Sequence, residues 1–455
     1  MSRISVLIPG IMGSELKLNN KLIWPGPVAS LWFPYKLMNE LLSPDLVATD
    51  VIRTYSITTQ YQAIIDDLGT LGFHEAVGSL IVFPYDWRKA NEVSALVLAD
   101  RLDKSLAESA APDDLEFTLL AHSMGGLIAR YYLESGKFDA RPAFKKVTGL
   151  ITLGTPHRGA PLALHRILGQ EKAVWLSADQ IRQAANDPRY LSAYQLLPPP
   201  DEPFAWNESP AAGYGAVDLY DEAKAVTRGL SAVGLRSARE FHAALDHRKR
   251  PAHVRYFCYS GTRQTTPTVS IVREPLTGFE THKHERDDGG DGMVPFWSSV
   301  LPGVQGISVG GEHSVIYKDK ELRRTLAALL GKPGALGRIA LGTDSNRDVE
   351  VSVRDKVVEP SCDVHLVLTP TSSGQSLDGE LRIERAMNQD TPQTAYLGVG
   401  QPLPLRYTGP AAASFGLVAS APKEPGAYRF AFYPNGSNSS AGADPFFVQA
   451  PNTRT

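Results

Sequence analysis

A serine in a glycine-rich turn is the first residue of the chain that suits nucleophilic catalysis. Ser123 stands in AHSMGG (121–126), between an apolar stretch and a helix-like one. A sharp turn between a strand and a helix lifts a serine hydroxyl out of a sheet, and the helix then offers backbone N–H groups to a developing oxyanion. Ala121 stands where such turns usually have glycine, and its small side chain suits the close approach of strand and helix. We therefore predict that Ser123 is a nucleophile.

A serine hydroxyl needs a base to take its proton, and His313 is the strongest candidate. It lies late in the chain in GGEHS (310–314), after a strand-like GISV and before the last expected helix. His122 stands inside the tight turn and should pack beneath the site, whereas His282 and His284 lie in a charged run that favours solvent. A solvated loop histidine is the alternative interpretation of His313.

The base needs a carboxylate to orient it, and Asp291 in GDGMVP (290–295) supplies one. Asp291 falls between Ser123 and His313, which is the order of nucleophile, acid and base that accompanies this kind of turn. Asp287 and Asp288 are close competitors. The acidic cluster could also be only a turn or a cation site.

A glycine-rich loop near the N-terminus could help to stabilise the oxyanion. PGIMG (9–13) follows a short apolar run that we interpret as a strand. Oxyanion stabilisation needs two N–H donors, and we predict those of Ile11 and of Met124, the residue after the nucleophile. The alternative is that this loop is merely a glycine turn.

The elements that must position these residues alternate between strands and helices. Strands are expected at 3–9, 79–83, 116–121, 147–153 and 254–260, and helices at 61–71, at 91–109, after Ser123 and near 320–330. This alternation predicts a mostly parallel sheet covered on both faces. With the strand, turn and helix around Ser123, it predicts the α/β-hydrolase fold.

Two segments lack this alternation of strands and helices, and they suggest the domain organisation. Residues 162–250 mix helical pieces with proline clusters, as expected of a cap over the substrate site. After about residue 340 the chain changes to short β-type runs separated by Gly, Pro, Asn and Ser. We predict a catalytic domain over 1–338, with a lid segment at about 20–50 and the cap, and a β-sandwich-like domain over 345–455.

Composition excludes several classes of function. The chain has 455 residues, 46 basic and 49 acidic side chains and a formal charge of −3, so bulk charge does not predict binding to nucleic acid or to anionic membranes. Its two cysteines, Cys258 and Cys362, exclude a disulfide framework. The first apolar run is too short for a signal peptide, no stretch is long enough to cross a bilayer, and we expect a cytoplasmic protein. No residue cluster with ligand spacing implies a metal or cofactor.

The chain resembles the lecithin:cholesterol acyltransferase and lysosomal phospholipase A2 family of α/β-hydrolases. The resemblance covers roughly residues 3–330 and is carried by PGIMGSEL (9–16), PYDWR (84–88), AHSMGG (121–126), LGTPHRGAP (153–161), GDGMVP (290–295) and EHS (312–314). It implies that Ser123 is the nucleophile, Asp291 the acid, His313 the base, and the backbones of Ile11 and Met124 the oxyanion donors. Secreted members carry signal peptides and disulfides, which this chain lacks, so plasma-lipoprotein and lysosomal roles are not expected.

The apolar segment around residues 23–35 resembles the lid and lipid-contacting region of that family. It contains Trp24, Leu31, Trp32 and Phe33. Ordinary packing of the cap on the core is the alternative for these side chains. Asp86, Trp87 and Arg88 are interpreted as structural residues near the floor of the site.

These observations predict a serine hydrolase or acyltransferase that acts on acyl esters, with lipids or phospholipids as the expected substrates. A short-chain esterase or an intracellular polyester depolymerase is a second hypothesis. The third is an inert hydrolase-fold scaffold that acts through its C-terminal domain. Expected partners are the ester substrate, a lipid surface touched through the lid and a protein bound by the β domain, but no nucleic acid.

Overall fold

The computed structural model describes residues 2–28, 35–174, 176–208, 215–274, 278–332, 349–370, 376–408 and 414–450. A central sheet of six strands forms the core of its larger part, in the order β14-β11-β9-β8-β1-β7. Every neighbouring pair in this sheet is parallel. Its strands, in chain order, are β1 Ser2–Ile8, β7 Leu80–Val82, β8 Leu115–His122, β9 Val147–Leu153, β11 Arg255–Thr262 and β14 Gln305–Gly310.

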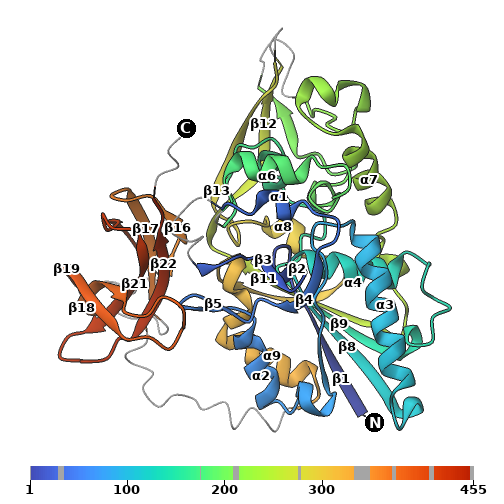
Figure 1. Ribbon diagram of the computed structural model, residues 1–455, viewed down its shortest axis with the longest axis horizontal. Coiled ribbons are helices and arrows are strands. Elements are labelled where there is room, and N and C mark those ends of the chain that lie inside the picture. Colours follow the sequence, from blue (N-terminus) through green and yellow to red (C-terminus); the bar gives the residue numbers. More distant parts are fainter. Residues whose placement is uncertain are drawn as a thin grey trace.

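Helices cover both faces of this sheet, because its strands are apolar on both sides (Figure 1). One face packs against α3 (Asn91–Ala107) and α4 (Met124–Glu134), and alternate residues of β1 such as Ile4 and Val6 belong to that core. The other face packs against α2 (Gln62–Thr70) and α9 (Lys320–Leu329). The predicted strands and helices of the sheet region are confirmed to within two residues at their ends.

A small antiparallel sheet occupies part of the predicted lid segment. It has the order β3-β2-β4, and its strands are β2 Ser14–Leu18, β3 Lys21–Trp24 and β4 Val47–Val51. The short helix α1 (Met38–Leu41) lies between the last two, and the two-stranded β5 (Thr54–Tyr55) and β6 (Thr58–Thr59) follow. This segment is folded against the core, since Trp24 and Leu41 are fully buried.

The cap is built from helices and a three-stranded sheet. Its elements are α5 Leu162–Ile167, α6 Ala178–Ala185, β10 Ala205–Asn207, α7 Ala232–Ala243, β12 Gln264–Arg273 and β13 Glu280–Gly290, and α8 (Phe296–Ser299) follows the sheet. The long β12–β13 hairpin extends this layer beyond residue 250 (Figure 1). It was not predicted, because β13 is mostly polar and exposed and therefore lacks the apolar alternation of a half-buried strand.

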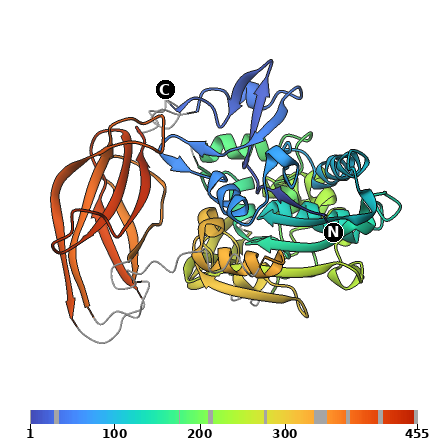
Figure 2. The same ribbon diagram turned by 90° about the horizontal axis from the view of Figure 1, so that it is seen from below.

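The C-terminal region forms two facing sheets around a core of its own (Figure 2). One sheet has the order β15-β17-β20 and the other β16-β22-β21-β18-β19. The strands are β15 Val349–Val353, β16 Val357–Val358, β17 Asp363–Pro370, β18 Ser376–Ala386, β19 Tyr396–Thr408, β20 Phe415–Ser420, β21 Gly426–Pro434 and β22 Gly442–Val448. This arrangement confirms the predicted β-sandwich character. The region touches the catalytic part, since Lys172 donates a hydrogen bond to the Val357 carbonyl at 3.0 Å.

Candidate active site

Ser123 occupies a sharp turn between β8, which ends at His122, and α4, which begins at Met124. Its backbone angles, φ 52° and ψ −127°, lie in a region that side-chain-bearing residues rarely adopt. The Ser123 N–H donates to the Leu153 carbonyl at 2.8 Å, which ties the turn to the end of β9. The helix can approach closely only because residue 126 is glycine: a Cβ there would lie 2.0 Å from Oγ1 of Thr155. The turn therefore has the geometry predicted from AHSMGG.

The three predicted residues Ser123, His313 and Asp291 form one chain of hydrogen bonds. His313 opens the 3-10 helix η9 (His313–Lys318), which follows β14. Its Nε2 lies 2.8 Å from Oγ of Ser123, and its Nδ1 lies 2.7 Å from Oδ2 of Asp291. A carboxylate only accepts, so Nδ1 carries the proton and Nε2 is left to accept from the serine hydroxyl. This is the arrangement in which an imidazole can act as a base toward a hydroxyl.

Asp291 is fully buried, and backbone N–H groups hold one oxygen of its carboxylate. Its Oδ1 accepts from the N–H groups of Met293 at 3.1 Å and Val294 at 2.7 Å. Its own carbonyl accepts from the His313 N–H at 2.8 Å, so the acid and base loops are joined twice. The two competitors, Asp287 and Asp288, lie exposed on β13. Of the three carboxylates, the structure brings Asp291 to His313.

His122 lies beneath the site, as its position in the turn predicts, and contacts the base loop. Its Nε2 lies 3.0 Å from the His313 carbonyl and its Nδ1 lies 2.7 Å from the Tyr61 hydroxyl. Because a carbonyl only accepts, Nε2 carries the proton and Nδ1 accepts from Tyr61. Burial, together with the neighbouring His313, lowers the pKa of His122 to about 3, so this ring stays neutral at ordinary pH.

The glycine-rich loop at 9–13 is connected to the same network. The Gly10 N–H donates to the Tyr61 hydroxyl at 2.8 Å. A Cβ at position 10 would lie 2.8 Å from the Cβ of Ser123, so the loop passes directly beside the nucleophile. Tyr61 lies at the start of the helix predicted at 61–71, and nothing local in the sequence shows that its hydroxyl would join Gly10 to His122.

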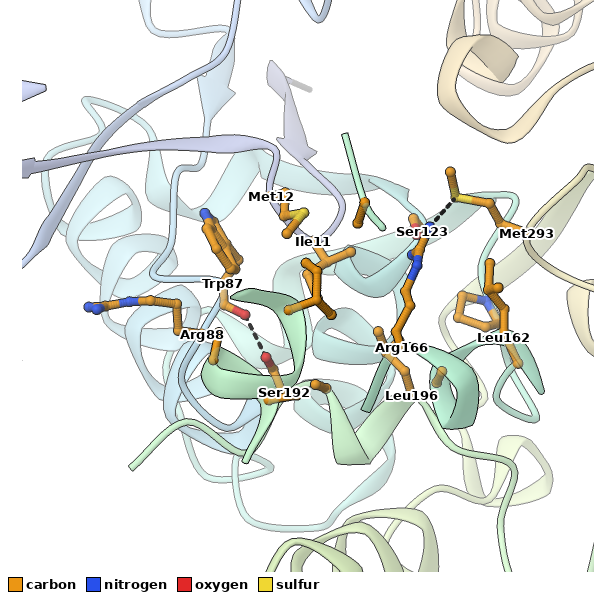
Figure 3. Close-up of a pocket in the computed structure, with 18 of the residues that line it drawn as sticks. Ile11, Met12, Trp87, Arg88, Ser123, Leu162, Arg166, Ser192, Leu196 and Met293 are labelled. Atoms are coloured by element: carbon orange, nitrogen blue, oxygen red, sulfur yellow. Dashed lines mark hydrogen bonds between the residues drawn. The ribbon is translucent and has the colours of Figure 1, made fainter. Parts of the chain in front are cut away.

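A largely apolar cavity opens above Ser123 and His313 (Figure 3). It holds about 910 Å³, part of it open to solvent. The apolar side chains that line it come from the early loops and from the cap, and include Ile11, Met12, Trp87, Leu162, Ile181 and Leu196. Ile11 lines this cavity together with Ser123, and Met124 is buried at the start of α4.

The predicted structural role of Asp86 and Arg88 agrees with their contacts. The Arg88 guanidinium pairs with the Asp86 carboxylate through two nitrogens at 2.7 and 2.8 Å. It also donates to the carbonyls of Leu41 at 2.5 Å and Ser43 at 2.8 Å, and to the Tyr190 hydroxyl at 3.1 Å. Arg88 therefore joins the wall of the cavity to the segment before β4.

Of the predicted lid residues, Trp24 lies in the described part and is a packing residue. Its side chain is 1% exposed, it stacks edge-on against Trp87 at 5.3 Å between ring centroids, and its Nε1 donates to the Met12 carbonyl at 2.8 Å. It therefore packs against the loop at 9–13 and is absent from the cavity lining. Leu31, Trp32 and Phe33 lie outside the described residues.

The described residues also bear on metals and membranes. Within them, no group of three or more His, Cys, Asp or Glu side chains could hold a metal ion. No helix in the part of the chain that the structure describes has the length and apolar character to span a membrane. Both cysteines are free thiols.

The parallel sheet and the serine turn define an α/β-hydrolase. The family model described as lecithin:cholesterol acyltransferase matches residues 45–222, which include Ser123 and Met124 but not Ile11, Asp291 or His313. Over these residues the chain is similar to the lecithin:cholesterol acyltransferase family, and it is an ester hydrolase or acyltransferase.

Solved structures with a similar chain path share little sequence with this protein. The chain in the Tle4-Tli4 complex is 16% identical, with 75% of this chain and 100% of that chain covered and a TM-score of 0.48. The lin2722 product of Listeria innocua is 10% identical, with 73% and 95% covered and a TM-score of 0.32. Phospholipase PlaB from Legionella pneumophila is 13% identical, with 98% and 92% covered and a TM-score of 0.26. No curated protein sequence matches the chain.

Proposed function

We propose that this protein is a serine hydrolase that cleaves acyl esters of lipids through an acyl-enzyme on Ser123. The observation that carries the proposal is the hydrogen-bonded chain from Ser123 through His313 to the buried Asp291, placed at the floor of an apolar cavity. A buried carboxylate behind the imidazole favours the protonated ring that forms when the base takes a proton.

In the proposed reaction the Ser123 hydroxyl attacks the ester carbonyl while His313 takes its proton. The negative charge that develops on the carbonyl oxygen is stabilised by the N–H groups of Ile11 and Met124. The first N–H groups of a helix have no partner within it, which leaves that of Met124 free for this role. When the ester C–O bond breaks, His313 returns the proton to the departing alcohol. Water, or an acceptor alcohol, then releases the acyl group from Ser123 by the same steps in reverse.

A lipid substrate is supported by the walls of the cavity. The side chains beside Ser123 are mainly aliphatic or aromatic, and they favour an acyl chain removed from water. The acyltransferase family model points to the same ester chemistry. A short-chain esterase or polyester depolymerase would use the same residues with a different acyl preference. We further propose a cytoplasmic location, in keeping with the two free cysteines.

The first experiment compares wild type with Ser123→Ala on p-nitrophenyl esters from acetate to palmitate, and measures labelling by a fluorophosphonate. Loss of the nucleophile should lower kcat roughly ten-thousand-fold or more and abolish labelling. Ser135→Ala is the matched control, because Ser135 caps the other end of the same helix α4 and should leave both readouts unchanged.

The acyl-chain profile decides between the hydrolase hypotheses. Higher kcat/KM on long chains supports a lipase, whereas a maximum at acetate or butyrate supports a short-chain esterase. A folded wild-type protein that neither turns over any ester nor reacts with the fluorophosphonate would support the scaffold hypothesis instead.

A further inference from the structure

Two arginines line the cavity above Ser123, and their surroundings differ (Figure 3). Arg88 is saturated by the Asp86 carboxylate and by three further acceptors. Arg166, on α5, has no carboxylate partner among the residues that the structure describes. Its Nη2 reaches only the Met293 sulfur, at 4.0 Å, and its Nε is buried without an acceptor.

The positive charge of Arg166 is not compensated within the cavity. Burial lowers the pKa of this guanidinium, but an arginine remains protonated at neutral pH. Glu171 interacts with the guanidinium electrostatically, but its carboxylate forms an ion pair with Lys283 at 2.6 Å. None of the described residues that line the cavity is acidic. Arg166 therefore presents an unpaired cation to a largely apolar space.

A purely structural arginine at this depth would be expected to have partners like those of Arg88. An unpaired buried charge is costly, because it loses its water without gaining a counter-charge. Arg166 shares the cavity with Ser123 and His313, so a molecule bound for attack by Ser123 lies in the same space as the guanidinium. The charge can be satisfied there by the substrate.

We propose that Arg166 binds an anionic group, a phosphate or carboxylate, on the acyl ester that Ser123 attacks. The inference rests on the proposed function and specifies the substrate class. The substrate is an ester with an apolar acyl chain and a phosphate or carboxylate on its alcohol or acyl part. The planar guanidinium can donate two parallel hydrogen bonds to such a group, which a lysine cannot. The apolar walls exclude water and strengthen this pairing.

The test uses two substrates that differ by one phosphate, monolauroylglycerol and lauroyl-glycerophosphate, with released laurate as the readout. The kcat/KM ratio of the phosphorylated to the neutral ester should fall about 10- to 100-fold in Arg166→Gln, because a charge-assisted hydrogen bond is lost. Arg166→Lys should recover part of that ratio. Arg182→Gln is the matched control: it removes the same charge from the neighbouring helix α6, but Arg182 is exposed and pairs with Asp179 outside the cavity. It should keep the wild-type ratio.

Binding of both lipids to the Ser123→Ala protein, followed by calorimetry with and without Arg166→Gln, tests the same difference without turnover. Inorganic phosphate is added as a competitor against the neutral ester. The proposal would be overturned if the kcat/KM ratio and the difference in lipid binding were the same with and without Arg166. It would also be overturned if Arg166 affected only the competition by inorganic phosphate, and neither of these two lipid measurements. Failure of the proposed function has a different signature, because the wild-type protein would then fail to react with a fluorophosphonate at Ser123.

Discussion

An ion pair links the β domain to the loop that carries His313, and breaking it should impair catalysis from a distance. Lys356 lies between β15 and β16, and its Nζ is 3.3 Å from Oε2 of Glu312, the residue before His313. Lys356 also pairs with Asp444 on β22. The other carboxylate oxygen of Glu312 accepts a hydrogen bond from the Ser314 hydroxyl at 2.6 Å. The Glu312 carboxylate therefore contacts Lys356 through one oxygen and the residue after His313 through the other. The perturbation is Lys356→Met, which keeps the length of the side chain and removes its charge.

The size of the effect follows from the geometry of the pair. Two unit charges separated by 3.3 Å attract by about 5 kcal/mol at an effective dielectric constant of about 20. The side chains are 26% and 14% exposed, so solvent screens part of this attraction. We expect Lys356→Met to lower the free energy of unfolding by about 2–4 kcal/mol, since it leaves Glu312 and Asp444 facing each other with Lys318 as the remaining nearby cation. A loosened His313 should lower kcat about 10- to 100-fold, because misplacing a catalytic group by about 1 Å costs rate on that scale.

The assay is a double-mutant cycle of Lys356→Met and Glu312→Gln, read by kcat on a p-nitrophenyl ester and by urea unfolding. We expect a coupling energy of about 1 kcal/mol or more between the two substitutions. Arg354→Met is the matched control: Arg354 pairs with Glu285 across the same domain contact at 3.6 Å, but it is half exposed and its partner Glu285 is not next to His313 in the chain. Loss of the Arg354–Glu285 pair should lower the free energy of unfolding by about 0–1 kcal/mol and leave kcat unchanged. Additive effects in the cycle, or an unchanged kcat in Lys356→Met, would refute the reasoning.

Three further predictions address the site and the cap. Asp291→Asn should keep the fold but lower kcat roughly ten-thousand-fold, because an amide favours the wrong tautomer of the ring; a loss below tenfold in steady-state assays would contradict its role. Gly10→Ala places a Cβ 2.8 Å from that of Ser123 and should cost more than about a hundredfold in fluorophosphonate labelling; wild-type labelling would argue against this close approach. His242 donates to the Leu197 carbonyl from a buried site, and burial lowers its pKa to about 4. As the pH falls below about 6.5, this histidine is protonated in the unfolded chain before it is protonated in the folded one, so the free energy of unfolding should drop by about 2.5 kcal/mol by about pH 4.5. The His242→Gln protein should not show this drop. Equal acid sensitivity of the two proteins in urea titrations would contradict the prediction.

Local motifs could be predicted from the sequence because each is built by neighbouring residues. The turn at Ser123 needs a strand, small residues and a helix within about ten positions, and all are visible in the chain. The choice of Asp291 over Asp287 and Asp288 was harder, since the three lie within five residues. The decisive fact is that β13 continues through Gly290, so the earlier two carboxylates lie exposed along a strand and Asp291 is the first residue beyond its end.

Features that depend on distant residues could not be predicted in this way. Trp24 stands in an apolar segment that resembles a lid, yet it is buried against Trp87 and the loop that carries Met12. The importance of Arg166 lies in what it does not contact, and an absent partner leaves no pattern in a sequence. The β12–β13 hairpin was missed because its second strand buries almost nothing and so shows no apolar period.

The C-terminal domain illustrates how function can depend on a contact between segments that look independent. Its short apolar runs predict a separate sandwich, and its own core confirms that character. The sequence gives no sign that Lys356 would meet Glu312, because an ion pair across two domains follows from how their surfaces meet. His313 is nevertheless held from two directions, by Asp291 on its ring and by Lys356 through the neighbouring Glu312. We therefore predict that the β domain helps to hold His313, the proposed base, and the double-mutant cycle measures how large that support is.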